Sequence, residues 1–137
     1  MRHRRQFILS AAALAVAASL PLSAAAEAPA KIGFVYVSPI GDAGWTYQHD
    51  EGRKEMEAAL GNKIETRYVE SVAEGADAER VIREFAASGS KIVFATSFGY
   101  MNYMQKLAKE YPDVKFEHAT GYKTAPNMTN YNIRFYE

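Results

Sequence analysis

The sequence predicts an α/β fold, in which a parallel sheet carries helices on both faces. Short apolar runs rich in β-branched residues, typical of buried strands, alternate along the chain with longer segments of helical periodicity. This alternation indicates parallel strands joined by right-handed helical crossovers. The length of 137 residues suits one small domain.

The individual elements follow from composition and from the residues that end them. Lys31–Val37 is an almost continuous apolar run, as in a strand buried on both faces, whereas Lys63–Glu70 is more polar and is expected near a sheet edge. Gly61 and Pro112 end helices, and Gly89 stands where a helix C′ glycine belongs. The other expected strands are Lys91–Thr96, Val114–Thr120 and the alternating stretch of Tyr131, Ile133 and Phe135, and the expected helices are Trp45–Leu60, Gly75–Gly89 and Tyr100–Tyr111.

Apolar stripes predict which side of each helix faces the sheet. Gly52 falls on the inner side of the first helix, where it is expected to permit close approach to a strand. Met101 and Met104 of the third helix are interpreted as core. The inner face of the first helix is expected to hold Trp45, His49, Gly52, Met56, Ala59 and Leu60, with Asp50, Glu51, Lys54 and Glu57 on the solvent side, and that of the second helix Ala78, Val81, Ile82, Phe85 and Ala86.

Residues 1–26 are predicted to be a cleaved export signal, which leaves 27–137 as the domain. A basic start, an apolar stretch and small residues at Ala24–Ala26 have the order of such a signal. The pair Arg4–Arg5 leaves the twin-arginine route open beside the Sec route, and an uncleaved anchor is the alternative. The mature chain would carry 13 basic and 16 acidic residues, and a periplasmic location is expected.

Composition and missing motifs exclude several classes of function. The absence of cysteine excludes disulfides, thiolate metal sites, a cysteine nucleophile and a lipobox anchor. The lack of a basic run after the export signal argues against nucleic acid as a partner. Neither G-x-G-x-x-G, a Walker A lysine, G-x-S-x-G nor a metal-ligand spacing occurs. We therefore expect no catalysis, no cofactor and no metal, and we interpret the lone His49 as a packed side chain.

The binding site is expected in the loops that follow the strands, because ligands of open α/β sheets bind at the carboxyl ends of strands. The first such loop carries Asp42 and the only tryptophan, Trp45, at a helix start. Trp45 is interpreted as a stacking surface for a flat ring, with a core position as the alternative. Asp42 is expected to accept hydrogen bonds from a ligand or to cap the helix. Phe98 and Tyr100 of a neighbouring loop could line the same wall.

Three stretches carry a resemblance to a known family: "KIGFVYVSPIGDAGWTYQHDEGRKEM", "KIVFATSFGYMNYM" and "NMTNYNIRFYE". With them, Lys31–Glu137 resembles the N-terminal lobe of the basic membrane protein (BMP/PnrA-like) family. The resemblance implies one Rossmann-like lobe of a type 1 periplasmic-binding fold in a protein that closes on its ligand. It also implies a solute-binding component of an ABC importer, with purine nucleosides or related ring compounds as ligands and a membrane permease as partner.

The resemblance carries over to individual residues of two loops. Where the family's first loop commonly reads Asp-x-Ser-Phe-Asn, this chain has Asp42 as the polar contact and Trp45 as the stacking aromatic. Gly44 and Thr46 replace the serine and the asparagine, which points to a different ring ligand. The ligand-binding residues implied are Asp42, Gly44, Trp45 and Thr46 in the first loop and Phe98, Gly99 and Tyr100 in the second.

The chain is expected to be incomplete, because its last strand pattern breaks off at Glu137 and the family's second lobe would follow there. At full length the protein is expected to be a monomer. Two alternatives to an importer component remain: an exported sensor domain of the same fold, and an exported enzyme of flavodoxin-like fold. A permease and an ATPase encoded beside the gene would favour import, whereas a receptor gene would favour sensing.

Overall fold

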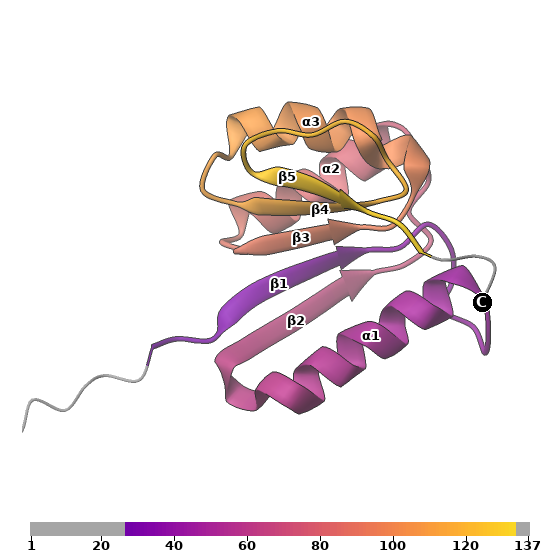
Figure 1. Cartoon of the computed structure of the whole chain (residues 1–137), viewed down its shortest axis with the longest axis vertical. Coiled ribbons are helices and arrows are strands. Elements are labelled where there is room, and N and C mark those ends of the chain that lie inside the picture. The colour runs from indigo at the N-terminus through magenta and orange to yellow at the C-terminus, as the bar shows by residue number, and fades with distance from the viewer. Residues whose placement is uncertain (1–26, 134–137) are drawn as a thin grey trace, which may run out of the picture.

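A computed structural model describes residues 27–133, which form a five-stranded parallel sheet with the order β2-β1-β3-β4-β5 (Figure 1). The predicted α/β class and the parallel sheet are thereby confirmed. The export signal predicted at residues 1–26, and Phe135, lie outside the described residues. The strands are β1 (Ala30–Val35), β2 (Ile64–Val69), β3 (Ile92–Ala95), β4 (Lys115–Ala119) and β5 (Met128–Tyr131), and the helices are α1 (Trp45–Leu60), α2 (Ala76–Ala87) and α3 (Met101–Glu110).

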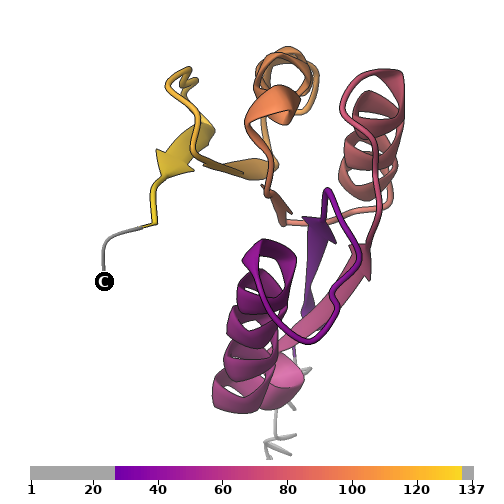
Figure 2. The ribbon, with the colours of Figure 1, turned by 90° about the vertical axis from the view of Figure 1, so that its right-hand side faces the viewer.

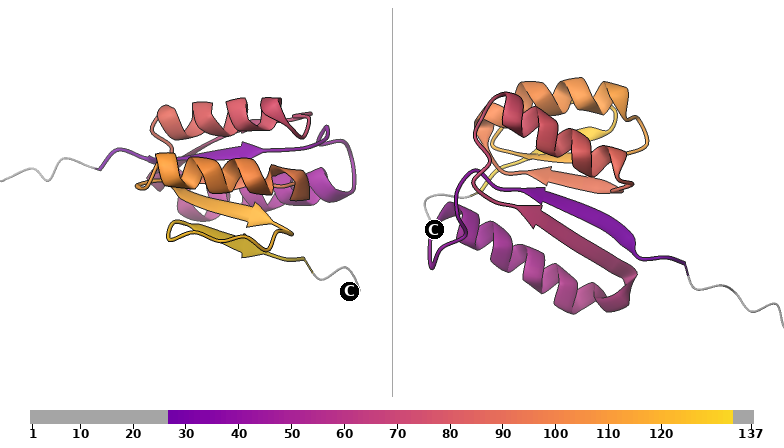
Figure 3. Two further views of the ribbon diagram at one scale, coloured as in Figure 1. Left: turned by 90° about the horizontal axis from the view of Figure 1, so that it is seen from above. Right: turned by 180° about the vertical axis from the view of Figure 1, so that it is seen from behind.

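The helices cover both faces of the sheet, as the sequence predicted. Helix α1 lies on one face, and α2 and α3 lie side by side on the other (Figure 2). Figure 3 shows the same layers from two further directions. The polar strand β2 is at one edge and β5 at the other. Within the described residues, no helix is long and apolar enough to cross a membrane.

The main core lies between the sheet and the pair α2–α3. Its strands contribute side chains such as Val35, Val93 and Phe116, none of which is exposed. Met101 and Met104 are also buried, so their interpretation as core is confirmed. The stripe predicted for α2 is buried as well, with Phe85 partly covered, and comprises Ala78, Val81, Ile82 and Ala86.

A glycine in β1 brings α2 close to the sheet. A Cβ atom on Gly33 would lie 2.5 Å from the nearest ring carbon of Phe85, where no side chain fits. The Phe85 ring therefore lies directly on the backbone of β1. The close approach of helix and strand that was expected at Gly52 occurs here instead, since no atom lies within 4 Å of a Cβ placed on Gly52.

The orientation predicted for α1 is wrong, because the helix turns a polar side to the sheet. Its buried residues are Thr46, Asp50 and Arg53, whereas Ala59 and Leu60 are exposed. Asp50 was expected in solvent, yet only 1 % of it is exposed. Buried charge is costly unless it is paired and hydrogen-bonded, so the burial of Asp50 must be explained by the partners of its carboxylate.

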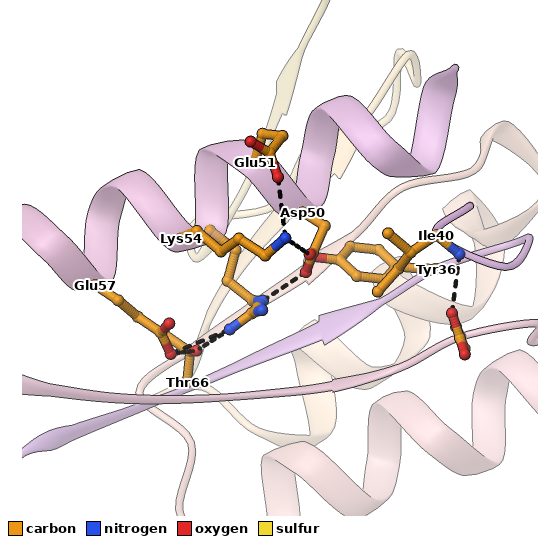
Figure 4. Close-up of polar contacts among 9 residues, drawn as sticks. Tyr36, Ile40, Asp50, Glu51, Lys54, Glu57 and Thr66 are labelled. Carbon is orange, nitrogen blue, oxygen red and sulfur yellow. Dashed lines mark hydrogen bonds and ion pairs between the residues drawn. The ribbon is translucent and has the colours of Figure 1, made fainter. Parts of the chain in front are cut away.

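Those partners form a network between α1 and the first two strands (Figure 4). The Asp50 carboxylate accepts hydrogen bonds from Nε of Arg53 at 2.7 Å and from the Tyr36 hydroxyl at 3.3 Å. Lys54 approaches the same carboxylate at 3.1 Å. Arg53 also donates to Oγ1 of Thr66 at 2.9 Å. Burial raises the pKa of Tyr36 and the Asp50 charge raises it further, so the phenol keeps the proton that it donates.

The apolar stripe of α1 borders a groove, and within the stripe only Met56 packs, partly buried, against a second core cluster of Ile32, Phe34 and Tyr36. The groove has a volume of about 260 Å³, and it lies between α1, the middle strands and the residues around β5. Burial lowers the pKa of His49 on this stripe, so its ring is neutral and Nδ1 donates to the carbonyl oxygen of Trp45 at 2.8 Å. The lining residues are Phe34, Gln48, His49, Gly52, Arg53, Met56, Phe94, Tyr131 and Ile133.

Candidate ligand-binding site

The carboxyl ends of the strands form one edge of the sheet, because all neighbouring strands are parallel and in level register. The last residue of β1, Val35, pairs with Ala95 of β3, and Ala95 pairs with His118 of β4. The loops after these strands therefore meet at this edge, which we call the carboxyl edge. This is where the sequence predicted the binding site.

Trp45 lies at the carboxyl edge, where it connects two loops. Its indole Nε1 donates a hydrogen bond of 2.6 Å to the carbonyl oxygen of Thr96, the residue that follows β3. The indole is tilted by 54° against the His49 ring, with 4.6 Å between ring centroids. The side chain is half-buried. Trp45 is thus neither a core residue nor a free surface aromatic. It is an anchored ring where the loop after β1 meets the loop after β3.

Asp42 does not cap α1. The N-cap residue is Gly44, and no side chain caps this helix. Asp42 is exposed and makes no hydrogen bond or ion pair to another described residue, so its carboxylate is available to a ligand. Gly44 has φ 96° and ψ −161°, a conformation essentially restricted to glycine. This backbone conformation accounts for the glycine at position 44.

The other predicted site residues differ in exposure. Thr46 is buried, and its hydroxyl shares a hydrogen bond of 2.7 Å with Ser38. Tyr100 is also buried and donates a 2.5 Å hydrogen bond to the carbonyl oxygen of Val72. Burial raises the pKa of Tyr100, which keeps this donor protonated. Thr46 and Tyr100 thus stabilise the loops through these hydrogen bonds. Phe98, in contrast, is 55 % exposed at the carboxyl edge.

Two carboxylates of the loop after β2 hold the neighbouring loops, and sequence reasoning missed both. Glu70 accepts a hydrogen bond of 2.9 Å from the backbone N–H of Ile40 in the first loop (Figure 4). Glu74 accepts one of 2.9 Å from the N–H of Gly99 and another from the Ser97 hydroxyl. The only signal in the sequence was their position, because Glu70 directly follows β2 and Glu74 comes four residues later in the same loop.

His118 is a third residue whose part in the site the sequence did not indicate. It is the penultimate residue of β4 and is fully buried. Its Nε2 donates to the carbonyl oxygen of Ser97 at 2.7 Å, and its Nδ1 lies 3.1 Å from Oδ1 of Asn130. The Nε2 hydrogen bond therefore ties the loop after β3 to β4.

The chemistry of the carboxyl edge suits a neutral polar ligand that contains a ring. Trp45 and Phe98 offer ring surfaces, and Asp42 offers an acceptor for hydroxyl or amino hydrogens. Among the described residues, no group of three or more histidine or acidic side chains could hold a metal ion.

Comparisons with known proteins identify the family of the chain. The family described as "ABC transporter substrate-binding protein PnrA-like" matches residues 30–137. The chain is 63 % identical over 115 residues to a protein of Brucella abortus (strain 2308) that is named as purine-binding. It is 44 % identical over 104 residues to a protein of Haloferax volcanii that is named as an ABC transporter glucose-binding protein. These matches take in 84 % and 76 % of the chain but only 33 % and 26 % of the two relatives, so the chain spans about a third of their length or less.

Solved structures share the fold at low sequence identity. An ABC transporter solute-binding protein from Conexibacter woesei superimposes with a TM-score of 0.69 at 21 % identity, over 75 % of this chain and 35 % of that one. A solute-binding protein from Aeropyrum pernix K1 gives 0.66 at 18 % identity, over 76 % and 28 %. With the family match over residues 30–137, the chain belongs to the PnrA-like family of ABC transporter substrate-binding proteins, which are solute-binding proteins and not enzymes, as expected.

Proposed function

We propose that the full-length protein binds a purine nucleoside, or a related ring-containing solute, as the periplasmic binding component of an ABC importer. The observation that carries this proposal is the combination, on one loop of the carboxyl edge, of an anchored aromatic ring, Trp45, with an exposed carboxylate, Asp42, that has no hydrogen-bond or ion-pair partner within residues 27–133. A purine offers a flat face to the indole, and its amino groups or the ribose hydroxyls offer hydrogens to the carboxylate.

The relatives support the proposal to different degrees. The relative at 63 % identity is named for binding purines, and its similarity covers 84 % of this chain. The relative at 44 % identity is named for binding glucose. A hexose is therefore the second candidate, since aromatic side chains and carboxylates also suit a sugar ring and its hydroxyls.

The proposed mechanism is binding without chemistry. The carboxyl edge supplies one wall of the site, and the remaining part of a protein about three times as long would supply the other. Closure of the two lobes would remove the ligand from water and present it to a permease in the inner membrane. Export by residues 1–26 would place the mature protein in the periplasm, and we expect a monomer. A sensor role for the same lobe would need a receptor as the partner.

Calorimetric titration of the full-length protein tests this function. The ligands are adenosine, guanosine, inosine, the corresponding free bases, ribose and glucose. We expect saturable one-to-one binding of at least one purine nucleoside, and much weaker binding of glucose. Binding of glucose without any nucleoside would establish the second candidate, and binding of neither class would contradict both.

A further inference from the structure

Two large aromatic side chains stand exposed next to each other at the carboxyl edge. Phe98, which follows β3, is 55 % exposed, and Tyr122, which follows β4, is 71 % exposed. Their ring centroids are 6.3 Å apart and the ring planes are inclined by 46°. β3 and β4 are neighbours in the sheet, so the two rings form one apolar patch, which we call the Phe98–Tyr122 pair.

The turn that carries Phe98 is held by hydrogen bonds to Glu74. The Glu74 carboxylate binds the residues on both sides of Phe98, through the Ser97 hydroxyl and the N–H of Gly99. A Cβ atom on Gly99 would lie 2.2 Å from the carboxyl carbon of Glu74, so any larger residue there would displace the carboxylate from its present position. Phe98 is thereby directed away from the body of the lobe.

The turn that carries Tyr122 is held by a separate set of contacts. A Cβ atom on Gly121 would lie 2.0 Å from Nδ1 of His118, so this turn too packs directly on a buried side chain. Nδ2 of Asn130 donates to the carbonyl oxygen of Lys123 at 2.7 Å. Thr120 adopts a left-handed backbone with φ 66°, which is unusual for a β-branched residue. Such strain is typically kept where the surrounding structure enforces it for function.

The two turns are also joined to each other. The same His118 ring that packs on Gly121 donates from Nε2 to the carbonyl oxygen of Ser97, next to Phe98. The exposed rings therefore stand on one connected, internally bonded support. A rigid support beneath exposed aromatic side chains is the arrangement that a preformed binding surface requires.

We propose that the Phe98–Tyr122 pair contacts the base of the bound nucleoside and forms a second aromatic surface beside Trp45. This inference rests on the proposed function. The indole of Trp45 donates a hydrogen bond to Thr96 and packs against the His49 ring. Phe98 and Tyr122, in contrast, contact each other and leave most of their surface exposed. Offset or inclined aromatic contacts suit a planar heterocycle, and a pentose offers no such plane. Tyr122 thus becomes a specificity-determining residue.

Calorimetric titration of full-length Phe98→Ala, Tyr122→Ala and Tyr122→Phe variants tests the inference. Guanosine, guanine, adenosine, adenine and ribose are the probes. Each alanine variant should lose roughly 5- to 150-fold in affinity, the range for removing one base-stacking side chain. The loss should be equal for a nucleoside and its free base. Tyr122→Phe, which keeps the ring, should stay within about threefold of the unmodified protein.

Leu60→Ala is the matched control, because Leu60 is an exposed apolar side chain at the opposite end of α1 and should leave affinity unchanged. If the unmodified protein binds no purine compound, the proposed function fails and this inference fails with it. If it binds them and both alanine variants stay within twofold, the inference alone is overturned. A loss for nucleosides but not for free bases would also overturn it. So would a lower unfolding temperature of the ligand-free variants with unchanged affinity, because the pair would then pack against the rest of the protein.

Discussion

Trp45 connects the loop after β1 to the loop after β3 through one hydrogen bond, from its indole Nε1 to the carbonyl oxygen of Thr96. Its position at the edge was predictable from the sequence, because a glycine-rich loop led directly into a helix. The anchor was not, because Thr96 is 51 residues away in the chain. The same holds for the Glu74–Gly99 contact, which depends on two loops meeting in space.

Replacing Trp45 should weaken ligand binding in two steps. Trp45→Ala removes both the ring surface and the loop anchor, and we expect affinity for the preferred nucleoside to fall at least about tenfold. Trp45→Phe keeps a ring but loses the N–H donor. Its affinity should lie between those of the unmodified protein and the Trp45→Ala variant. Calorimetric titration of the full-length variants measures both values. An alanine variant that binds within twofold of the unmodified protein would refute a ligand contact for Trp45.

At the scale of elements, apolar periodicity predicted the strands and the packing of α2 but misplaced the face of α1. The stripe of α2 faces the core, with Ala78 and Ile82 fully buried. In α1 the buried residues include Asp50 and Arg53, which form an ion pair with each other. Asp50 also accepts a hydrogen bond from Tyr36, just after β1, and Arg53 donates one to Thr66 of β2. A pattern of apolar residues cannot reveal a buried polar face, because its stability depends on partners from other elements.

The pairing of Asp50 predicts a specific pH dependence of stability. Burial alone would raise the pKa of Asp50, but hydrogen bonds from Arg53 and Lys54 hold it below its usual value. The charged form is therefore favoured by folding, and its contribution is fully present above the unfolded pKa, about 3.9. It is lost as pH falls through the lower folded pKa.

Urea unfolding of the full-length protein from about pH 6 down to about pH 2, through the unfolded pKa, measures this contribution. Asp50→Asn should be less stable at pH 6, and the difference from the unmodified protein should shrink in acid. Asp50→Ala should cost about 3–5 kcal/mol at pH 6, since Arg53 would stay buried without its partner. Glu65→Gln, in an exposed pair with Arg67, is the control and should change stability by less than about 1 kcal/mol. A difference for Asp50→Asn that is constant with pH would contradict the account.

The contact between β1 and α2 predicts a coupled pair of substitutions. Gly33→Ala places a methyl group against the Phe85 ring and should destabilise the protein by about 1–3 kcal/mol through overpacking. Phe85→Ala removes the obstacle, so Gly33→Ala should cost much less in that background. Urea unfolding of the two single variants and the double variant gives the coupling free energy. Additive effects would show that the Phe85 ring does not limit the space at Gly33.

At the scale of the whole molecule, residues 27–133 provide one edge of loops and no opposing wall. The sequence predicted this single-lobed architecture through its family resemblance, and the family match over residues 30–137 confirms the membership. The solute could not be predicted with the same certainty. Specificity depends on contacts from both sides of the ligand, and the chain spans 33 % of its purine-binding relative.

The proposed export of the protein predicts a defined mature N-terminus. Cleavage after Ala26 should leave Glu27 as the first residue, because small residues at Ala24 and Ala26 suit a signal peptidase. Mass spectrometry of the N-terminal peptide from the periplasmic protein measures this directly. A native protein that still begins at Met1 would instead support the uncleaved anchor.

The central claim is that the carboxyl edge of this lobe binds the base of a purine nucleoside. A crystal structure of the full-length protein, grown with the nucleoside that binds most tightly in solution, tests it most directly. We predict electron density for the base against Trp45 and the Phe98–Tyr122 pair, with the Asp42 carboxylate within hydrogen-bond distance of the ligand. A nucleoside bound away from the carboxyl edge, or one that touches none of these residues, would contradict the claim.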